Sequence, residues 1–252
     1  MLHHVPGRDI GDVVAAMDAR LVRMPPERAA QRLFLETYRR TTLAVGTAVD
    51  DAQFEDPEWV ERWDVVFADL YLAALELDLE ASPDVPRPWR LAFDAPAGLP
   101  ALRHVLLGIN AHINYDLPQA LLAVISDEEF ADPVLVARRS RDHERIDRVL
   151  SGRVAAEDSE LGTVSPPSFA DRLLQPLNRL SSKRFLREAR QKVWHNTMEL
   201  QTSRLVGEDA YRARLAELEV LSAARIADLL APGQVLLRLA VAGFGVTLPP
   251  PR

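Results

Sequence analysis

The chain contains no cysteine among its 252 residues. This absence excludes disulfide bonds, thiolate chemistry and cysteine-ligated zinc, and it fits a reducing compartment such as the cytosol. The sequence also lacks a long hydrophobic run, since residues 234–248 are interrupted by Arg238 and two glycines and are too short to span a bilayer. The first six residues contain no apolar secretory core. We therefore expect a soluble, cytoplasmic protein with no membrane partner.

An excess of basic residues is also missing. The chain has 30 Lys and Arg against 37 Asp and Glu, for a net charge of −7 and a pI near 5.4. A general nucleic-acid-binding protein needs a basic face, so we expect no nucleic-acid partner. The hydrophobic fraction of 48% and the charged fraction of 27% are ordinary for a globular protein, and a small molecule is the partner we expect.

Strand-like alternation of polar and apolar residues does not persist beyond a few positions, whereas the helical period recurs through most of the chain. Asp56 followed by Pro57 has the order of a helix cap and a first-turn proline. The proline-rich segment 81–100 predicts an irregular connection, and the polar, acidic segment 151–167 predicts a mobile loop. The pattern predicts an all-α fold, with residues 1–252 forming a single-domain bundle of about nine helices. Besides the helix described next, the expected helices include residues 10–24, 27–49, 57–80, 133–150, 183–206, 208–230 and 234–246.

The segment from Gly108 to Pro118 places polar residues where a buried helix should be apolar. At about 100° per residue, an apolar stripe runs along one side of this helix. The stripe consists of Leu102, Leu106, Ile109, Ile113 and Leu117. Every fourth residue beside it belongs to a polar row of His104, Gly108, His112 and Asp116, in which the glycine leaves room for another group to approach. We interpret this row as a polar pocket built into the helical core.

The spacing His-x-x-x-Asp/Glu occurs three times, and residues four apart on a helix face the same way. Each pair could chelate one divalent ion, or its carboxylate could orient the imidazole. Alternatives stay open for each pair: a buried histidine held by its carboxylate without a metal for the first two, and a surface ion pair for the third. The pairs are His112 with Asp116, His143 with Asp147, and His195 with Glu199.

Three further residues are candidates for catalytic roles. Asp64 lies within the edge of the apolar face of its helix, where an unpaired carboxylate is costly and should have a cation or donors. Asp69 is the alternative acid on the same helix. Asn110 and Asn114 flank the motif helix on its other side, where they either hydrogen-bond a ligand or satisfy a neighbouring helix end.

Residues 106–122 resemble the histidine and aspartate helix of the zinc-dependent phospholipase C and single-strand nuclease superfamily, through His112-x-x-x-Asp116-Leu-Pro-Gln-Ala-Leu. The resemblance implies an all-helical protein that hydrolyses phosphoesters with several zinc ions. The superfamily uses an N-terminal Trp as a ligand, whereas this chain begins with Met1 and has fewer histidines, so a site with one or two metals is the most it implies. The whole Gly-Ile-Asn-Ala-His-Ile-Asn-x-Asp-Leu motif also resembles an uncharacterised group of bacterial helical proteins.

These patterns together predict a metal-dependent hydrolase for a small phosphoester or a related substrate, with zinc favoured and iron or manganese possible. The alternatives are a metal-free His/Asp acid–base enzyme, a helical small-molecule-binding protein and a di-iron oxidase-like protein. The expected metal ligands are His104, His112, Asp116, His143 and His195. The expected catalytic residues are Asp64, Asp147, Asn110 and Asn114.

Overall fold

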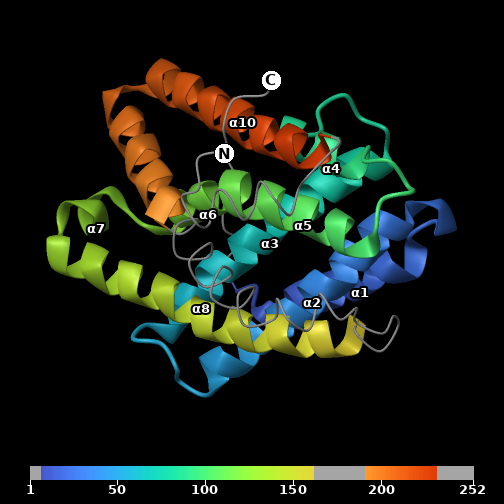
Figure 1. The fold of residues 1–252 in the computed structure, drawn as a ribbon. Helices are drawn as coiled ribbons and strands as arrows, with labels where there is room; N and C mark the ends of the chain where they lie inside the picture. The colour runs from blue at the N-terminus through green and yellow to red at the C-terminus, as the bar shows by residue number, and fades with distance from the viewer. Residues whose placement is uncertain (1–6, 162–190, 232–252) are drawn as a thin grey trace, which may run out of the picture.

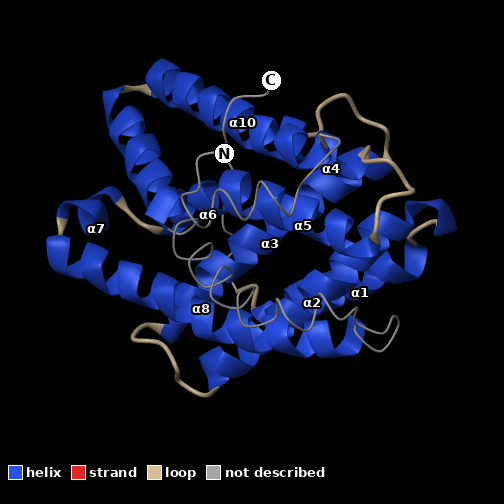
Figure 2. Ribbon diagram, in the orientation of Figure 1, coloured by secondary structure: helices blue, strands red, loops and turns tan. Residues whose placement is uncertain are grey.

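The computed structural model describes residues 7–161 and 191–231 of the chain. Helices make up 83% of the structure, and the described residues include no strand (Figure 2). Over these described residues, the prediction of an all-α, single-domain bundle with about nine helices is confirmed. None of the helices in these two ranges is both long and apolar enough to cross a membrane.

The helices follow one another with short connections, and their bounds are close to those predicted for the first half of the chain. Residues 191–206 are also helical, and the helix predicted at residues 234–246 lies outside the described residues. In chain order the elements are α1 (Ile10–Arg23), the 3₁₀ turn η1 (Pro26–Arg28), α2 (Ala29–Asp50), α3 (Pro57–Leu79), α4 (Arg87–Phe93), α5 (Ala101–Ala111), the π-helical turn η2 (His112–Asp116), α6 (Leu117–Val124), α7 (Asp127–Ala131), α8 (Pro133–Leu161) and α10 (Glu208–Leu230).

Helix α3 is the central element of the bundle and packs against α1, α2 and α6 (Figure 1). It begins as the sequence predicts, because the Asp56 carboxylate accepts the backbone N–H of Trp59 at 3.1 Å and Pro57 occupies the first turn. Thirteen of its 23 residues are buried, including Asp64. A helix that is buried on most sides presents side chains to several neighbours at once, and α3 contributes most of its buried residues to the main hydrophobic core.

The remaining helices enclose α3 and its neighbours. Helix α10 packs along α4 and α5, and α8 packs against α2 and α7 (Figure 1). The helix at residues 191–206 joins α6 and α10 through a small cluster of leucines, Leu122, Leu200 and Leu218. The site described below lies where α2, α3, α4 and the α5–η2–α6 helix meet.

Two predicted connections are more helical than the sequence suggested. Residues 81–100 contain α4, because Pro88 lies in the first turn of that helix, where a missing backbone N–H costs nothing. Residues 151–161 of the loop predicted at residues 151–167 are helical instead, because α8 continues to Leu161. Residues 162–167 lie outside the described residues.

The motif helix passes Pro118 without a break because it widens just before the proline. The backbone N–H of Leu117 reaches the carbonyl of His112, five residues back, which is the hydrogen bond of a π-helical turn. Proline lacks an N–H and its ring clashes with the preceding turn of a regular α-helix, and the wider turn relieves that conflict. Such π-bulges occur frequently at functional sites, and this one holds both His112 and Asp116.

Candidate active site

His112 and Asp116 form a buried hydrogen-bonded pair, which we call the dyad. The Nδ1 atom of His112 lies 2.8 Å from Oδ2 of Asp116. The indole N–H of Trp89, on α4, donates to the same carboxylate oxygen at 2.8 Å. The three residues are 3%, 2% and 0% exposed, respectively. Two donors therefore converge on one oxygen inside the core.

Aromatic rings surround the imidazole of His112. The Phe67 ring, on α3, is stacked on it with centroids 3.5 Å apart and an interplanar angle of 5°. Tyr38, on α2, meets it edge to face at 4.6 Å and 82°. Phe34, Tyr71 and Trp89 complete the enclosure, with centroids between 5.7 and 6.5 Å from that of His112. The second ring nitrogen of His112, Nε2, is buried and has no hydrogen-bond partner.

The apolar surroundings disfavour charge on both members of the dyad. Burial lowers the pKa of His112 and raises the pKa of Asp116, and the hydrogen bond between them opposes both shifts. Because Oδ2 of Asp116 already accepts from Trp89, we assign it as the acceptor toward Nδ1 as well. In this assignment the proton of neutral His112 is on Nδ1 and the lone pair is on the unpartnered Nε2.

Asp64 is a second buried acid near this centre. It is 3% exposed and its Oδ2 atom has no hydrogen-bond partner. Burial, with a smaller effect of Glu61, raises the pKa of Asp64 to about 7. The Asp64 charge in turn contributes to a raised pKa of Tyr38, as does the Asp116 charge, although burial is the main cause. Tyr38 therefore lies within electrostatic reach of both carboxyl groups.

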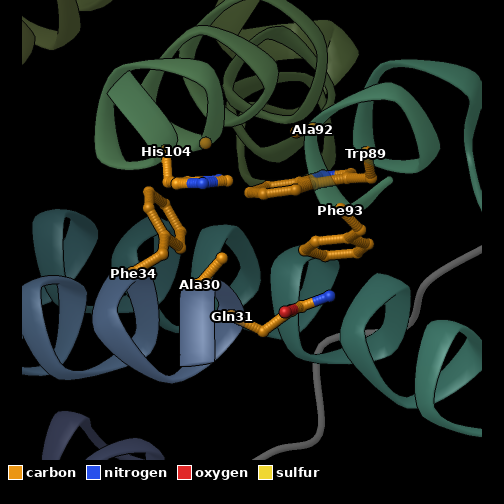
Figure 3. Close-up of a pocket in the computed structure, with 8 residues that line it drawn as sticks. Ala30, Gln31, Phe34, Trp89, Ala92, Phe93 and His104 are labelled. Atoms are coloured by element: carbon orange, nitrogen blue, oxygen red, sulfur yellow. The ribbon is translucent and has the colours of Figure 1, made fainter. Parts of the chain in front are cut away.

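His104 lies to one side of the dyad and lines a small hollow between α2, α4 and α5 (Figure 3). It is 8% exposed, and its Nδ1 atom has no hydrogen-bond partner. Gly108, one turn further along α5, also lines the hollow. A Cβ atom at Gly108 would lie 2.4 Å from the Phe34 ring, so the group for which this glycine leaves room is Phe34.

Asn110 and Asn114 bind the backbone of their own helix. The Asn110 side-chain amide donates to the carbonyl of Leu106 at 2.8 Å, and that of Asn114 donates to the carbonyl of Asn110 at 2.9 Å. These bonds satisfy carbonyl groups next to the π-helical turn, whereas the sequence suggested a ligand or a neighbouring helix end. Their amide donors are thereby engaged in supporting the turn that carries the dyad.

Among the described side chains, the histidines of the other two predicted pairs lie in surroundings different from those of the dyad. His143 is 2% exposed and lies between Trp63 and Trp194, with centroids 6.3 and 6.0 Å away. Two rings lie between His143 and His112: Phe67, which is stacked on His112, and Trp63, which is tilted against Phe67. The side chain of Asp147 lies outside the described residues. His195 is exposed on the helix at residues 191–206, away from the buried centre.

Within residues 7–161 and 191–231, no group of three or more His, Asp or Glu side chains is placed to hold a metal ion. Asp116 is turned toward Nδ1 of His112 and the indole of Trp89, so the two side chains form a hydrogen-bonded unit. Within the dyad, Nε2 of His112 is the atom that remains available to coordinate a metal.

Sequence reasoning missed the aromatic residues that define the site. Periodicity alone gives no sign of Trp89, because this residue lies in a proline-rich segment that predicts no helix. Phe34, Tyr38 and Phe67 follow ordinary core periodicity, so nothing distinguishes them from other core residues. The available signal was the first-turn proline of α4, which predicts a helix that would bury Trp89.

The fold and the dyad define an all-helical protein with a candidate acid–base centre in its core. The chain belongs to the family of unknown function DUF5995, whose family model matches residues 10–232. This result supports the predicted membership of an uncharacterised family. No curated protein and no solved structure matches the chain.

Proposed function

We propose that the protein is a metal-free acid–base enzyme for a small, uncharged molecule, with His112 as the base. The observation that carries the proposal is the state of the two imidazole nitrogens. Nδ1 is held by Asp116, while Nε2 is buried with no hydrogen-bond partner among the described residues. Buried polar atoms normally find hydrogen bonds, and an exception often marks a catalytic role or a missing ligand.

The surroundings give each residue of the centre a distinct role. Asp116 fixes the ring orientation and the tautomer of His112, and Trp89 holds the carboxylate in place through its indole N–H. Burial lowers the pKa of His112, so the ring is neutral and able to accept a proton at pH 7. When Nε2 takes a proton, the resulting imidazolium is stabilised by the Asp116 carboxylate beside it.

The aromatic enclosure determines which substrates suit this base. Phe67 and Tyr38 cover the imidazole and exclude water from it, so Nε2 is a desolvated base. No lysine or arginine is hydrogen-bonded to the dyad in the described part of the chain, so nothing there balances a charged substrate. Removal of a proton from a small apolar molecule is the reaction this environment supports best.

A nitrobenzisoxazole is a direct probe of such a base. A base removes its ring C–H proton, the N–O bond breaks, and a coloured cyanophenolate forms without any other reactant. We expect the wild-type protein to catalyse this elimination and His112→Gln to lower the rate by about 10²-fold or more, the usual contribution of a positioned base. His195→Gln is the matched control, because it removes an exposed histidine and should leave the rate unchanged.

Two further arms make the experiment decisive. Asp116→Asn keeps the imidazole, but its amide can donate to Nδ1 and move the proton to Nε2, so the rate should fall although His112 is present. A chelator should leave the wild-type rate unchanged. Catalysis that survives in His112→Gln, or that is equal in the two histidine variants, would contradict the proposal.

The metal-dependent hydrolase predicted from the sequence is tested by the same chelator arm. A metal-bound histidine commonly donates its other ring N–H to a carboxylate, and the His112–Asp116 bond has this form. Stoichiometric metal in the purified protein, together with loss of the rate on chelation, would favour that function over metal-free catalysis.

A further inference from the structure

The hollow beside the dyad has aromatic walls and contains no charge. Gln31 and Phe34 line it from α2, Trp89 and Phe93 from α4, and His104 and Gly108 from α5. Figure 3 shows the His104 and Trp89 rings pointing toward each other across the hollow, with Phe34, Gln31 and Phe93 along its other side. None of the described lining residues is acidic or basic apart from the histidine, so the hollow suits an uncharged ligand.

Two of its walls are shared with the dyad. Trp89 faces the hollow with its ring and binds Asp116 with its indole N–H. Phe34 packs edge to face on Trp89, with centroids 5.5 Å apart, and its ring centroid lies 6.5 Å from that of His112. A molecule in the hollow is therefore separated from the base only by the thickness of these rings.

Phe93 occupies the stacking surface that a flat ligand would use. Its ring lies nearly parallel to that of Trp89, with centroids 5.2 Å apart and an interplanar angle of 23°. It is the last residue of α4 and is only half-buried, so it can turn toward solvent more easily than the other rings. With Phe93 in place, the hollow has room for little more than a water molecule.

His104 supplies the polar contact. It is more than nine-tenths buried, lines the hollow, and has an unpartnered Nδ1 atom. A neutral imidazole has one acceptor nitrogen, and a buried acceptor that lacks a donor is unfavourable. A ligand hydroxyl at this position would remove that cost.

We propose that the hollow binds a flat, uncharged ring bearing a hydroxyl group, a ligand of the phenol class, which displaces Phe93 from Trp89 and donates to Nδ1 of His104. The ring stacks on Trp89 where Phe93 now lies. This inference goes beyond the proposed function, because the hollow lies beside the dyad and binding there needs no turnover.

Phenol and benzene are the probes, because they share the ring and differ in the hydroxyl. The indole N–H signal of Trp89, identified among the four tryptophans by its loss in Trp89→Phe, reports on binding by NMR. We expect phenol at millimolar concentration to shift this signal saturably. Benzene should bind about three- to tenfold more weakly, the contribution of one hydrogen bond.

Two variants test the individual contacts. Phe93→Ala should tighten phenol binding severalfold, because the seat on Trp89 is then open. Phe130→Ala, a half-buried phenylalanine on α7, is the matched control and should leave binding unchanged. His104→Phe keeps a flat ring and removes the acceptor, so phenol should lose its advantage over benzene.

Each outcome decides the proposal. Saturable phenol binding with the predicted preference supports it, even if the elimination assay shows no catalysis by His112, in which case the proposed function alone fails. Absence of a shift in the Trp89 signal overturns it. Equal binding of phenol and benzene, or no response to Phe93→Ala, overturns the hydroxyl contact or the displacement of Phe93.

Discussion

Two buried aspartates in this molecule have opposite surroundings. Asp142, on α8, is completely buried, and its two oxygens accept the backbone N–H groups of Glu55 and Asp56 at 2.7 and 2.8 Å and an Arg145 hydrogen bond at 2.9 Å. Asp64, on α3, is almost as buried, yet Oδ2 has no partner and the pKa is raised to about 7. The Asp142 carboxylate holds the backbone of the loop before α3 in place. The Asp64 carboxyl group, in contrast, has a pKa close to neutral pH.

The same contrast separates the larger regions around these residues. Asp142 belongs to an ion-pair network that connects the loop before α3 with α7 and α8. The other members of this network include Glu55, Asp56, Glu129, Arg139, Arg141 and Arg145. Around the dyad, the neighbouring side chains are aromatic rings and not counterions. Among the described residues, Nε2 of His112 and Nδ1 of His104 have no hydrogen-bond partner. The satisfied groups around Asp142 indicate a structural role, and the unsatisfied nitrogens of His112 and His104 are the atoms that the proposed reaction and ligand would use.

The largest effect is expected for Asp142→Ala. The substitution leaves two backbone N–H groups and Arg145 without their acceptor inside the protein, which should lower the free energy of unfolding by about 3–5 kcal/mol. Chemical denaturation measures this loss. Asp127→Ala removes an exposed carboxylate that pairs with Arg204, and it should lower the stability far less because solvent screens that pair. Equal losses in the two variants would remove the structural role assigned to Asp142.

Asp64→Asn should act in the opposite direction. Because the folded-state pKa of Asp64 is raised to about 7, this group stabilises the fold fully only below its unfolded pKa, near 4, and the contribution disappears as the pH rises through 7. Relative to the wild type, the variant should therefore gain roughly 3–4 kcal/mol between pH 4 and pH 8. Denaturation at both pH values measures the gain.

Asp69→Asn is the control for this prediction. Asp69 lies on the same helix, but it is partly exposed and pairs with Arg8. Its substitution should change the pH dependence far less than that of Asp64. If the difference in unfolding free energy between wild type and Asp64→Asn does not change with pH, Asp64 has a counterion or is exposed to water in solution.

Trp89→Phe should have a smaller effect that is specific to the dyad. It removes the indole donor from Asp116 and should cost about 1–2 kcal/mol of stability beyond the loss of ring contacts. Trp63→Phe is the matched control, because the Trp63 indole N–H is buried without a partner. Only the first variant should also slow the elimination reaction. If both slow it equally, Trp89 does not position Asp116.

The helices and the location of the motif could be predicted from the sequence, but the partners of the motif could not. Helical periodicity and the Asp56–Pro57 cap depend on neighbours in sequence, which is why α1, α2 and α3 are close to their predicted bounds. The His112–Asp116 bond also depends on local spacing, because the two residues lie four apart.

Long-range contacts explain what sequence reasoning missed. Trp89 reaches Asp116 across 27 residues, and nothing in its own segment indicates that bond. The row that contains Gly108 predicts a close approach, but only the fold shows that Phe34 makes it. Sequence reasoning placed His112 and His143 among the same expected metal ligands, but whether they meet depends on which faces of separate helices face each other. Phe67 and Trp63 lie along the path between them.

The protonation state of His112 tests the central claim most directly. Nitrogen NMR of histidine-labelled protein distinguishes the two neutral tautomers and the imidazolium, with His112→Gln identifying the signals. The account predicts a neutral ring at pH 7 with its proton on Nδ1, and a pKa below the ordinary value near 6.5 because the ring is buried. A proton on Nε2 at pH 7, in either the neutral or the charged ring, would contradict the assignment of His112 as the base.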